Sequence, residues 1–162
     1  ILSQVLYSFA YALTMPLSGW DAWFIWFVKA GAFFMDGGVE ASFLTSPVYA
    51  QDHPDYPLLI PLAISWLYTA AGAAEEQAGK AIYPLQFAAL LAIFHYGVAR
   101  YAGKKTGLLF AALVSITPLV LVHAAGFPVQ IDPSYAVKDS AGYADLAIAI
   151  YFLAAGLFIF IY

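Results

Sequence analysis

The sequence predicts an all-α membrane protein that crosses the bilayer several times. Its 162 residues are 64% hydrophobic and only 10% charged, and the mean hydropathy is +0.81. A soluble domain of this length could not place so much apolar surface in one core. Long apolar runs separated by short polar segments therefore indicate a bundle of transmembrane helices.

Charge and cysteine content exclude several classes of protein. The net charge is −4, and the six Lys and Arg residues are scattered along the chain, so there is no basic patch for nucleic acid. The chain has no cysteine, which excludes a disulfide framework, a thiolate metal site and a cysteine nucleophile.

Four apolar runs are predicted to span the membrane: about 1–17, 81–101, 107–126 and 145–162. A spanning helix needs about 20 residues at a rise of 1.5 Å each, and the two internal runs meet that length. The outer two are cut short by the ends of the sequence. We therefore expect the chain to be the N-terminal part of a single transmembrane domain whose remaining helices are absent.

Two shorter apolar runs, about 20–35 and 57–72, are predicted to be helices lying on the outer membrane surface. Both have natural boundaries, and the second contains Pro57 and Pro61 and is followed by Gly-Ala-Ala-Glu-Glu. The stretch 36–56 is rich in Gly, Pro and Asp, as expected of an external linker.

Basic residues predict the orientation of the chain. Arg100, Lys104 and Lys105 fall in the tight turn RYAGKKTG between two long apolar runs, and the positive-inside rule places that turn in the cytoplasm. The loop 127–144 is then external. If 57–72 does not span, Asp21 and Asp145 share the outer face.

Asp21 is the first candidate catalytic residue. It stands in SGWDAWFIWFVK, among tryptophans that are favoured at the membrane surface. Two interpretations are equally supported: a capping acid for the following helix, or a general base whose pKa is raised in an apolar cavity. Asp145 begins the last apolar run; alone it suits a helix N-terminus, but together with Asp21 it becomes a second candidate.

Several other side chains are candidates for binding. Asp52, His53 and Asp55 match no established metal spacing, so an exposed polar loop explains them better than a metal site, although His53 is also placed to contact a phosphate. Lys29 either extends toward lipid headgroups or reaches a phosphate. The aromatic residues around it fit membrane anchoring better than a sugar platform.

His95 and His123 invite a haem interpretation, which their depths contradict. His95 lies five residues from Arg100 and His123 eighteen from Lys105, a difference in depth of roughly 20 Å at 1.5 Å per residue. His123 remains of interest because it is predicted to lie at the outer face, near Asp145.

The order of these features resembles the N-terminal part of the GT-C glycosyltransferases. The features are an acid in GWDAWFIWFVKA, the segment HPDYPLLIPLAISWLY, a hairpin ending in SITPLVLVHAAG, and a second acid in YADLAIAIYF. The branch of protein O-mannosyltransferases and aminoarabinose transferases is the most similar. The resemblance covers nearly the whole chain, but about the first third of such an enzyme.

The resemblance implies a GT-C-like helix bundle with juxtamembrane helices in its first external loop. It also implies that Asp21 is the catalytic acid of the first loop and Asp145 the acid of the second. Tyr56 occupies the place where some members carry a lysine near the lipid phosphate, and His53 lies in the same segment. Many members have two adjacent acids in the first loop, whereas Ala22 follows Asp21 here.

The implied reaction moves a sugar, with inversion, from a polyprenyl-phosphate carrier to an acceptor hydroxyl outside the cytoplasm. The protein would lie in a bacterial inner membrane. A carboxylate accepts the hydroxyl proton, and Lys29, Lys80 or Lys138 stabilises the leaving phosphate, so a divalent metal is possible but not obligatory.

A different class also fits the residues. In a non-catalytic membrane subunit or a fragment of a transporter, Asp21 and Asp145 would only cap helices and the aromatic residues would anchor the protein.

Overall fold

The computed structural model describes residues 1–17, 19–39, 41–125, 129–132, 135–137 and 144–161. The all-α prediction is confirmed for most of this chain. The helices, in order, are α1 (Leu2–Thr14), the π-helix η1 (Ala22–Phe27), α2 (Val28–Asp36), α3 (Ala41–Thr45), the 3₁₀-helix η2 (Pro47–Asp52), α4 (Leu59–Ala71), α5 (Glu76–Lys80), α6 (Ile82–Ala102), α7 (Lys104–Ser115), α8 (Pro118–Ala125) and α9 (Asp145–Ile161).

A small hairpin departs from the all-α prediction. Strands β1 (Val129–Asp132) and β2 (Tyr135–Val137) pair antiparallel, with Val129 opposite Val137. They lie in the stretch that we predicted as an external loop. The sequence Val-Gln-Ile-Asp alternates apolar and polar residues, which is the period of a strand.

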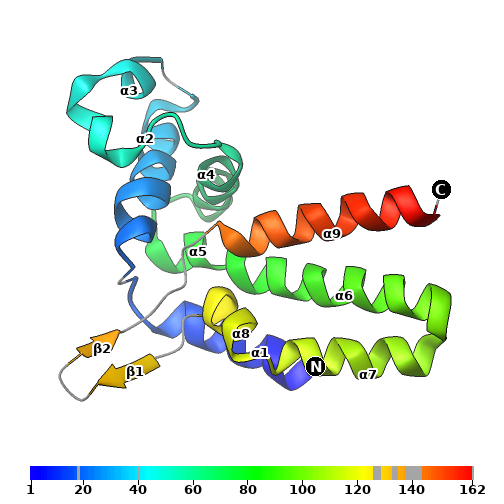
Figure 1. The fold of residues 1–162 in the computed structure, drawn as a ribbon. Coiled ribbons are helices and arrows are strands. Elements are labelled where there is room, and N and C mark those ends of the chain that lie inside the picture. The colour runs from blue at the N-terminus through cyan, green and yellow to red at the C-terminus, as the bar shows by residue number, and fades with distance from the viewer. Residues whose placement is uncertain (18, 40, 126–128, 133–134, 138–143, 162) are drawn as a thin grey trace.

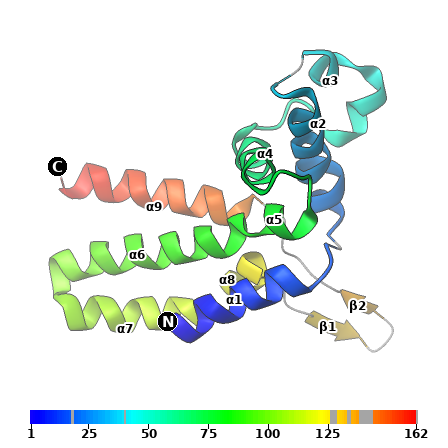
Figure 2. The same ribbon diagram turned by 180° about the vertical axis from the view of Figure 1, so that it is seen from behind.

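The longer helices run along one direction around α6, which packs against α7, α9 and α1, and two others cross one end of this set. Figures 1 and 2 show α1, α6, α7 and α9 running along a common direction, with the turn between α6 and α7 at one end and α2 and α4 at the other. Chain direction alternates along this set: α1 and α7 run toward the α2–α4 end, and α6 and α9 run away from it. Neither α2 nor α4 continues the direction of the bundle.

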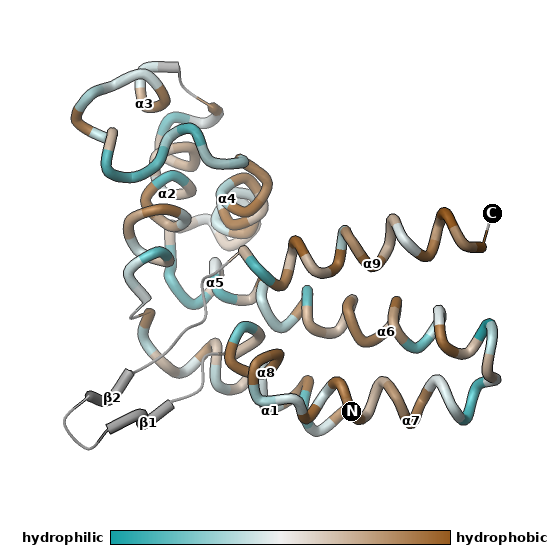
Figure 3. Tube along the Cα trace, in the orientation of Figure 1, coloured by the Kyte–Doolittle hydropathy of each residue, from teal (hydrophilic) through white to brown (hydrophobic). Residues whose placement is uncertain are grey.

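Hydropathy follows the same division. Figure 3 shows hydrophobic residues along much of α6 and α9, and polar residues at the α6–α7 turn and between α3 and α4. One continuous helix in the described residues, Glu76–Ala102, has the length and composition to cross a membrane, and α7 with α8 would make a second if the two count as one span. The shorter helices α4 and α9 are also apolar.

The helix predicted over 107–126 is broken in two. Helices α7 and α8 meet at an angle of 69°, and Pro118 is the first residue of α8. Proline has no N–H to donate and disfavours helical geometry in the residue before it, so a helix commonly ends there and a new one begins. At the break, the Leu113 carbonyl accepts hydrogen bonds from the Ile116 N–H at 3.3 Å and from the Thr117 hydroxyl at 3.1 Å.

The predicted surface helices are present, with changes. The first, expected over 20–35, is a π-helical turn followed by α2, and the second is α4. The linker expected over 36–56 contains α3 and η2, so it is more ordered than we predicted.

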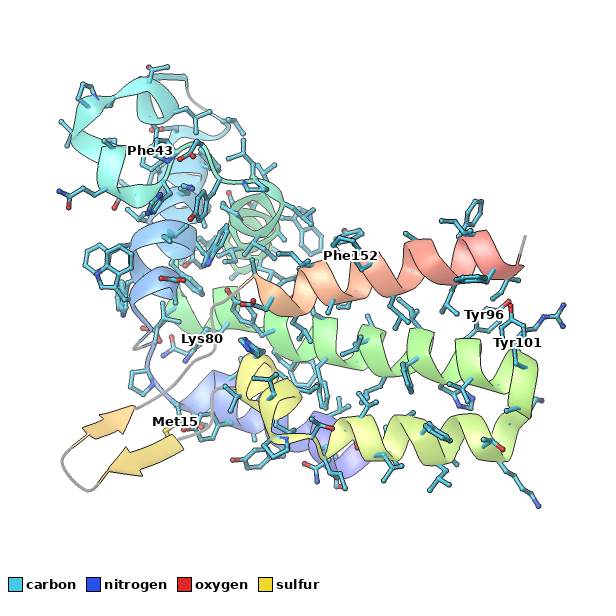
Figure 4. The ribbon with its side chains drawn as sticks, in the orientation of Figure 1. Met15, Phe43, Lys80, Tyr96, Tyr101 and Phe152 are labelled. Atoms are coloured by element: carbon cyan, nitrogen blue, oxygen red, sulfur yellow. The ribbon has the colours of Figure 1, made fainter. Side chains whose placement is uncertain are left out.

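Two hydrophobic cores hold the fold together. The larger joins η1, α2 and α4 to the first turns of α6 and α9, and the smaller lies between α6, α8 and α9. At the other end of the bundle, the Tyr101 hydroxyl of α6 donates a hydrogen bond to the Phe160 carbonyl of α9 at 2.8 Å (Figure 4). The larger core includes Ile25, Trp26, Phe27, Ile60, Ile64, Tyr68, Tyr83 and Ala147.

Candidate functional site

The structure brings three predicted binding residues together at the α2–α4 end. Lys29, in the first turn of α2, has no exposed surface. Its ammonium donates a hydrogen bond to the carbonyl of His53 and lies 5.6 Å from the centre of the Tyr56 ring and 5.7 Å from that of Trp26. The charge is therefore held by one carbonyl and two aromatic faces.

The cover on this lysine is a short turn between η2 and α4. His53 ends η2 with φ 48° and ψ 63°, in the left-handed region, and such a non-glycine residue costs on the order of 1–3 kcal/mol. Its ring stacks on Tyr56, with centres 4.6 Å apart. The Tyr56 N–H donates to the His53 carbonyl at 3.0 Å, the same oxygen that binds Lys29.

Burial lowers the pKa of Lys29 from its ordinary value of 10.5, and the negative charges of Asp55 and Asp52 oppose the shift. Desolvation is the larger effect because a buried ammonium loses its hydration. No carboxylate in the described part of the chain lies within ion-pair distance of Lys29. Among the residues that the structure describes, this charge therefore has no ionic partner.

Lys80 has different surroundings. It is also buried, at 1% exposed, but its ammonium is 3.2 Å from Glu76. Glu76 in turn accepts a hydrogen bond from the backbone N–H of Leu17. This pair therefore joins α5 to the segment that follows α1, where Figure 4 places Lys80. Lys80 is held in this ion pair with Glu76, and Lys138 lies outside the described residues. Of the three lysines predicted to stabilise a leaving phosphate, Lys29 is therefore the remaining candidate among the described residues.

An apolar groove of about 460 Å³ adjoins the lysine cluster. Trp26 and Tyr56, the two rings that face Lys29, form one part of its wall, and α4 and α9 supply the rest. Figure 4 shows Phe152 on the side of α9 that faces α4. The remaining lining residues are Pro57, Leu59, Ile60, Ala144, Ala147, Ile148 and Tyr151.

Asp145 lies in the first turn of α9, directly after Ala144 of the groove wall. Its side chain is 65% exposed, and one carboxylate oxygen is 3.8 Å from Nδ1 of His123 on α8. The structure thus brings together these two predicted residues.

Asp21 stands at the start of η1, half-buried, in helical conformation and without a side-chain capping bond. The capping interpretation of this acid therefore has no support from its own contacts. Asp21 and Asp145 are adjacent in the chain to Ala22 and Ala144, which meet at the larger hydrophobic core, and Figure 1 shows the start of α9 at the same end of the bundle as α2. Within the described chain, neither acid bonds to the other or to Lys29.

Two residues that contact the buried lysines were not predicted from the sequence to do so. Trp26, predicted only as an anchor, is 6% exposed and faces Lys29; its position three residues before the lysine on one helix was the available signal. Glu76 pairs with Lys80 at the i, i+4 spacing typical of helical ion pairs. Across the described residues, no group of three or more potential metal ligands is gathered.

Comparisons of the chain with protein families, with curated proteins and with solved structures find no match.

Proposed function

We propose that this chain belongs to a membrane glycosyltransferase that transfers a sugar from a polyprenyl-phosphate carrier to an acceptor hydroxyl outside the cytoplasm. One observation carries the proposal: a buried lysine, without an ion-pair partner among the described residues, whose two aromatic neighbours also line an apolar groove of about 460 Å³. An anionic head beside Lys29 and a hydrocarbon chain in the groove match these two chemistries. A polyprenyl phosphate has both parts.

The proposal places α1, α6, α7 with α8, and α9 in a bacterial inner membrane, with α2 and α4 on its outer surface. The alternating directions of these helices and the crossing angle of α2 and α4 support this layout (Figures 1 and 2). The basic residues Arg100, Lys104 and Lys105 then lie on the cytoplasmic side.

The proposed reaction needs one base and one positive charge. Asp21 accepts the proton of the acceptor hydroxyl as its oxygen bonds to the anomeric carbon, and the bond from that carbon to the phosphate oxygen breaks. The electron pair leaves with the phosphate, whose charge Lys29 stabilises without an obligatory metal. Asp145 with His123 is the second carboxylate site on this face.

Binding of the carrier is tested with farnesyl phosphate, a short polyprenyl phosphate, and farnesol, which lacks the anion. We expect native mass spectrometry of the full-length protein in detergent to detect farnesyl phosphate and much less farnesol. Lys29→Met should weaken farnesyl phosphate binding at least about tenfold, the scale of one lost charged hydrogen bond. Lys105→Met, at an exposed lysine in the distant turn, is the matched control.

Catalysis is tested with Asp21→Asn in the full-length protein. This variant should bind farnesyl phosphate normally and fail to transfer sugar from a polyprenyl-phosphate donor in membranes. Full transfer activity would remove Asp21 as the base. The rival class, a non-catalytic subunit or transporter fragment, predicts that neither Lys29→Met nor Asp21→Asn changes carrier binding or donor consumption.

A further inference from the structure

Lys29 and the groove do not touch in the structure. The lysine has no exposed surface, whereas Trp26 and Tyr56 each have one face toward the ammonium and also line the groove. The two rings therefore separate the charge from the space that would hold a ligand. An anion in the groove reaches Lys29 only if this wall moves.

Tyr56 is the part of the wall that is least firmly held. Trp26 belongs to η1 and is 6% exposed, but Tyr56 is 38% exposed and belongs to a turn outside any helix or strand. That turn contains the left-handed His53, and moving it would relieve a conformation that non-glycine residues rarely adopt. Segments with few buried contacts and strained backbone open at lower free energy than the packed core.

Two polar groups would gain partners when the turn opens. The Lys29 ammonium has three N–H donors and bonds only the His53 carbonyl in the described chain. The indole N–H of Trp26 is buried and has no acceptor among the described residues. An oxyanion entering from the groove would supply acceptors for both donors. It would also replace the attraction from Asp55 on the turn and from Asp52 at the end of η2.

We propose that the turn carrying His53 and Tyr56 is a movable cover over Lys29, and that Tyr56 controls access of an oxyanion in the groove to the lysine. The inference rests on the proposed function for the identity of the anion, a lipid phosphate. The opening itself does not depend on that identity. It is a property of the protein without any ligand.

Acetylation of the lysines in the full-length, ligand-free protein tests the cover. Lys80 is an internal reference because it is equally buried but held by an ion pair inside packed helices. Relative to the same lysines in denaturant, we expect Lys29 to react with acetic anhydride at least about tenfold faster than Lys80, because local opening needs less free energy than unfolding of the core. Mass spectrometry of peptides gives both rates in one sample.

Two variants isolate the role of Tyr56. Tyr56→Ala removes the ring and should raise the Lys29 rate several-fold while the Lys80 rate stays constant. Tyr56→Phe keeps the ring and should leave both rates unchanged. Equal protection of Lys29 and Lys80, or a Lys29 rate that is insensitive to Tyr56→Ala, would overturn the proposal.

Acetylation in the presence of ligands distinguishes a failure of the movable cover from a failure of the proposed lipid-phosphate function. Farnesyl phosphate should slow acetylation of Lys29 in the native protein, and inorganic phosphate at the same concentration should do so less because it gains nothing from the groove. If the ligand-free rates behave as expected but farnesyl phosphate gives no protection, the cover stands and the lipid-phosphate function fails.

Discussion

Lys29 and Lys80 are both buried, and the difference between them follows from what surrounds each charge. The Glu76 carboxylate lies 3.2 Å from the Lys80 ammonium and neutralises it. This ion pair is part of the junction between α5 and the segment that follows α1. Lys29 has aromatic faces and a carbonyl but no ion-pair partner in the described chain. A buried charge without a partner is unfavourable for folding, and such a charge close to a groove is typical of binding sites.

The lowered pKa of Lys29 predicts how stability changes at alkaline pH. The folded state releases the Lys29 proton at lower pH than the unfolded state, whose pKa is near 10.5. Between these two values the unfolded state binds more protons, so stability rises with pH, by at most about 1.4 kcal/mol per pH unit. SDS titration in mixed micelles from pH 8 to 10 should show this rise, and Lys29→Met should remove it. The same slope in both proteins would contradict the burial of the charge.

Tyr68 of α4 should act in the opposite direction at higher pH. Burial and the negative charge of Glu76 raise its pKa to about 12, above the ordinary 10.0. The folded state keeps this proton longer, so its contribution to stability is complete below pH 10 and is lost as pH rises through 12, by up to about 3 kcal/mol. Tyr68→Phe should reduce the alkaline loss measured by the same titration. The phenyl ring introduced by this substitution preserves the edge-to-face contact with Phe34, whose ring centre lies 5.9 Å from that of Tyr68.

The candidate side chains were predictable from the sequence, but their contacts were not. Asp21, Lys29, His53 and Tyr56 stand out as polar groups beside apolar runs. Nothing local indicates that His53 adopts a left-handed backbone, because residues before proline are usually extended. The contact between Lys29 and the His53 carbonyl, 24 residues apart, depends on tertiary packing.

Among the elements, α6 was predicted well and α7–α8 was not. Helix α6 follows a long apolar run that ends at Gly103, whose φ is +87°, so the sequence defines its length. The break between α7 and α8 was indicated in the sequence by Pro118, but the continuous hydrophobicity of 107–126 predicted a single helix. The π-helical turn of η1 had none, since its one additional residue per turn is not encoded in an apolar period.

Close packing of α6 against α7 depends on Gly107. A Cβ there would lie 2.8 Å from the His95 carbonyl oxygen and 2.9 Å from the backbone nitrogen of Ala99, and backbone atoms cannot move aside without separating the helices. Gly107→Ala should therefore lower the free energy of unfolding by about 1–3 kcal/mol. Gly156→Ala on α9 is the matched control, because no atom lies within 4 Å of its added Cβ. It should leave stability unchanged or raise it by up to about 1 kcal/mol. Equal effects of the two substitutions would contradict the close approach.

At the scale of the molecule, the position of α4 relative to the membrane decides whether Asp21 and Asp145 can share a site. The prediction that α4 lies on the outer surface came from its length and prolines, and in the fold it crosses the end of the bundle instead of joining it (Figures 1 and 2). A spanning α4 would put η1 on the opposite side of the bilayer from the start of α9. The shared face therefore has a direct test.

Single cysteines provide that test, since the chain has none of its own. Ser42→Cys and Glu75→Cys introduce thiols at exposed positions before and after α4, and Lys105→Cys does so in the α6–α7 turn. A membrane-impermeant maleimide should label the first two from outside the cell and the third only after permeabilisation. Labelling of Ser42→Cys and Glu75→Cys from opposite sides would show that α4 spans the membrane. It would also separate the two carboxylates and leave the groove between α4 and α9 without the catalytic role proposed for this end of the bundle.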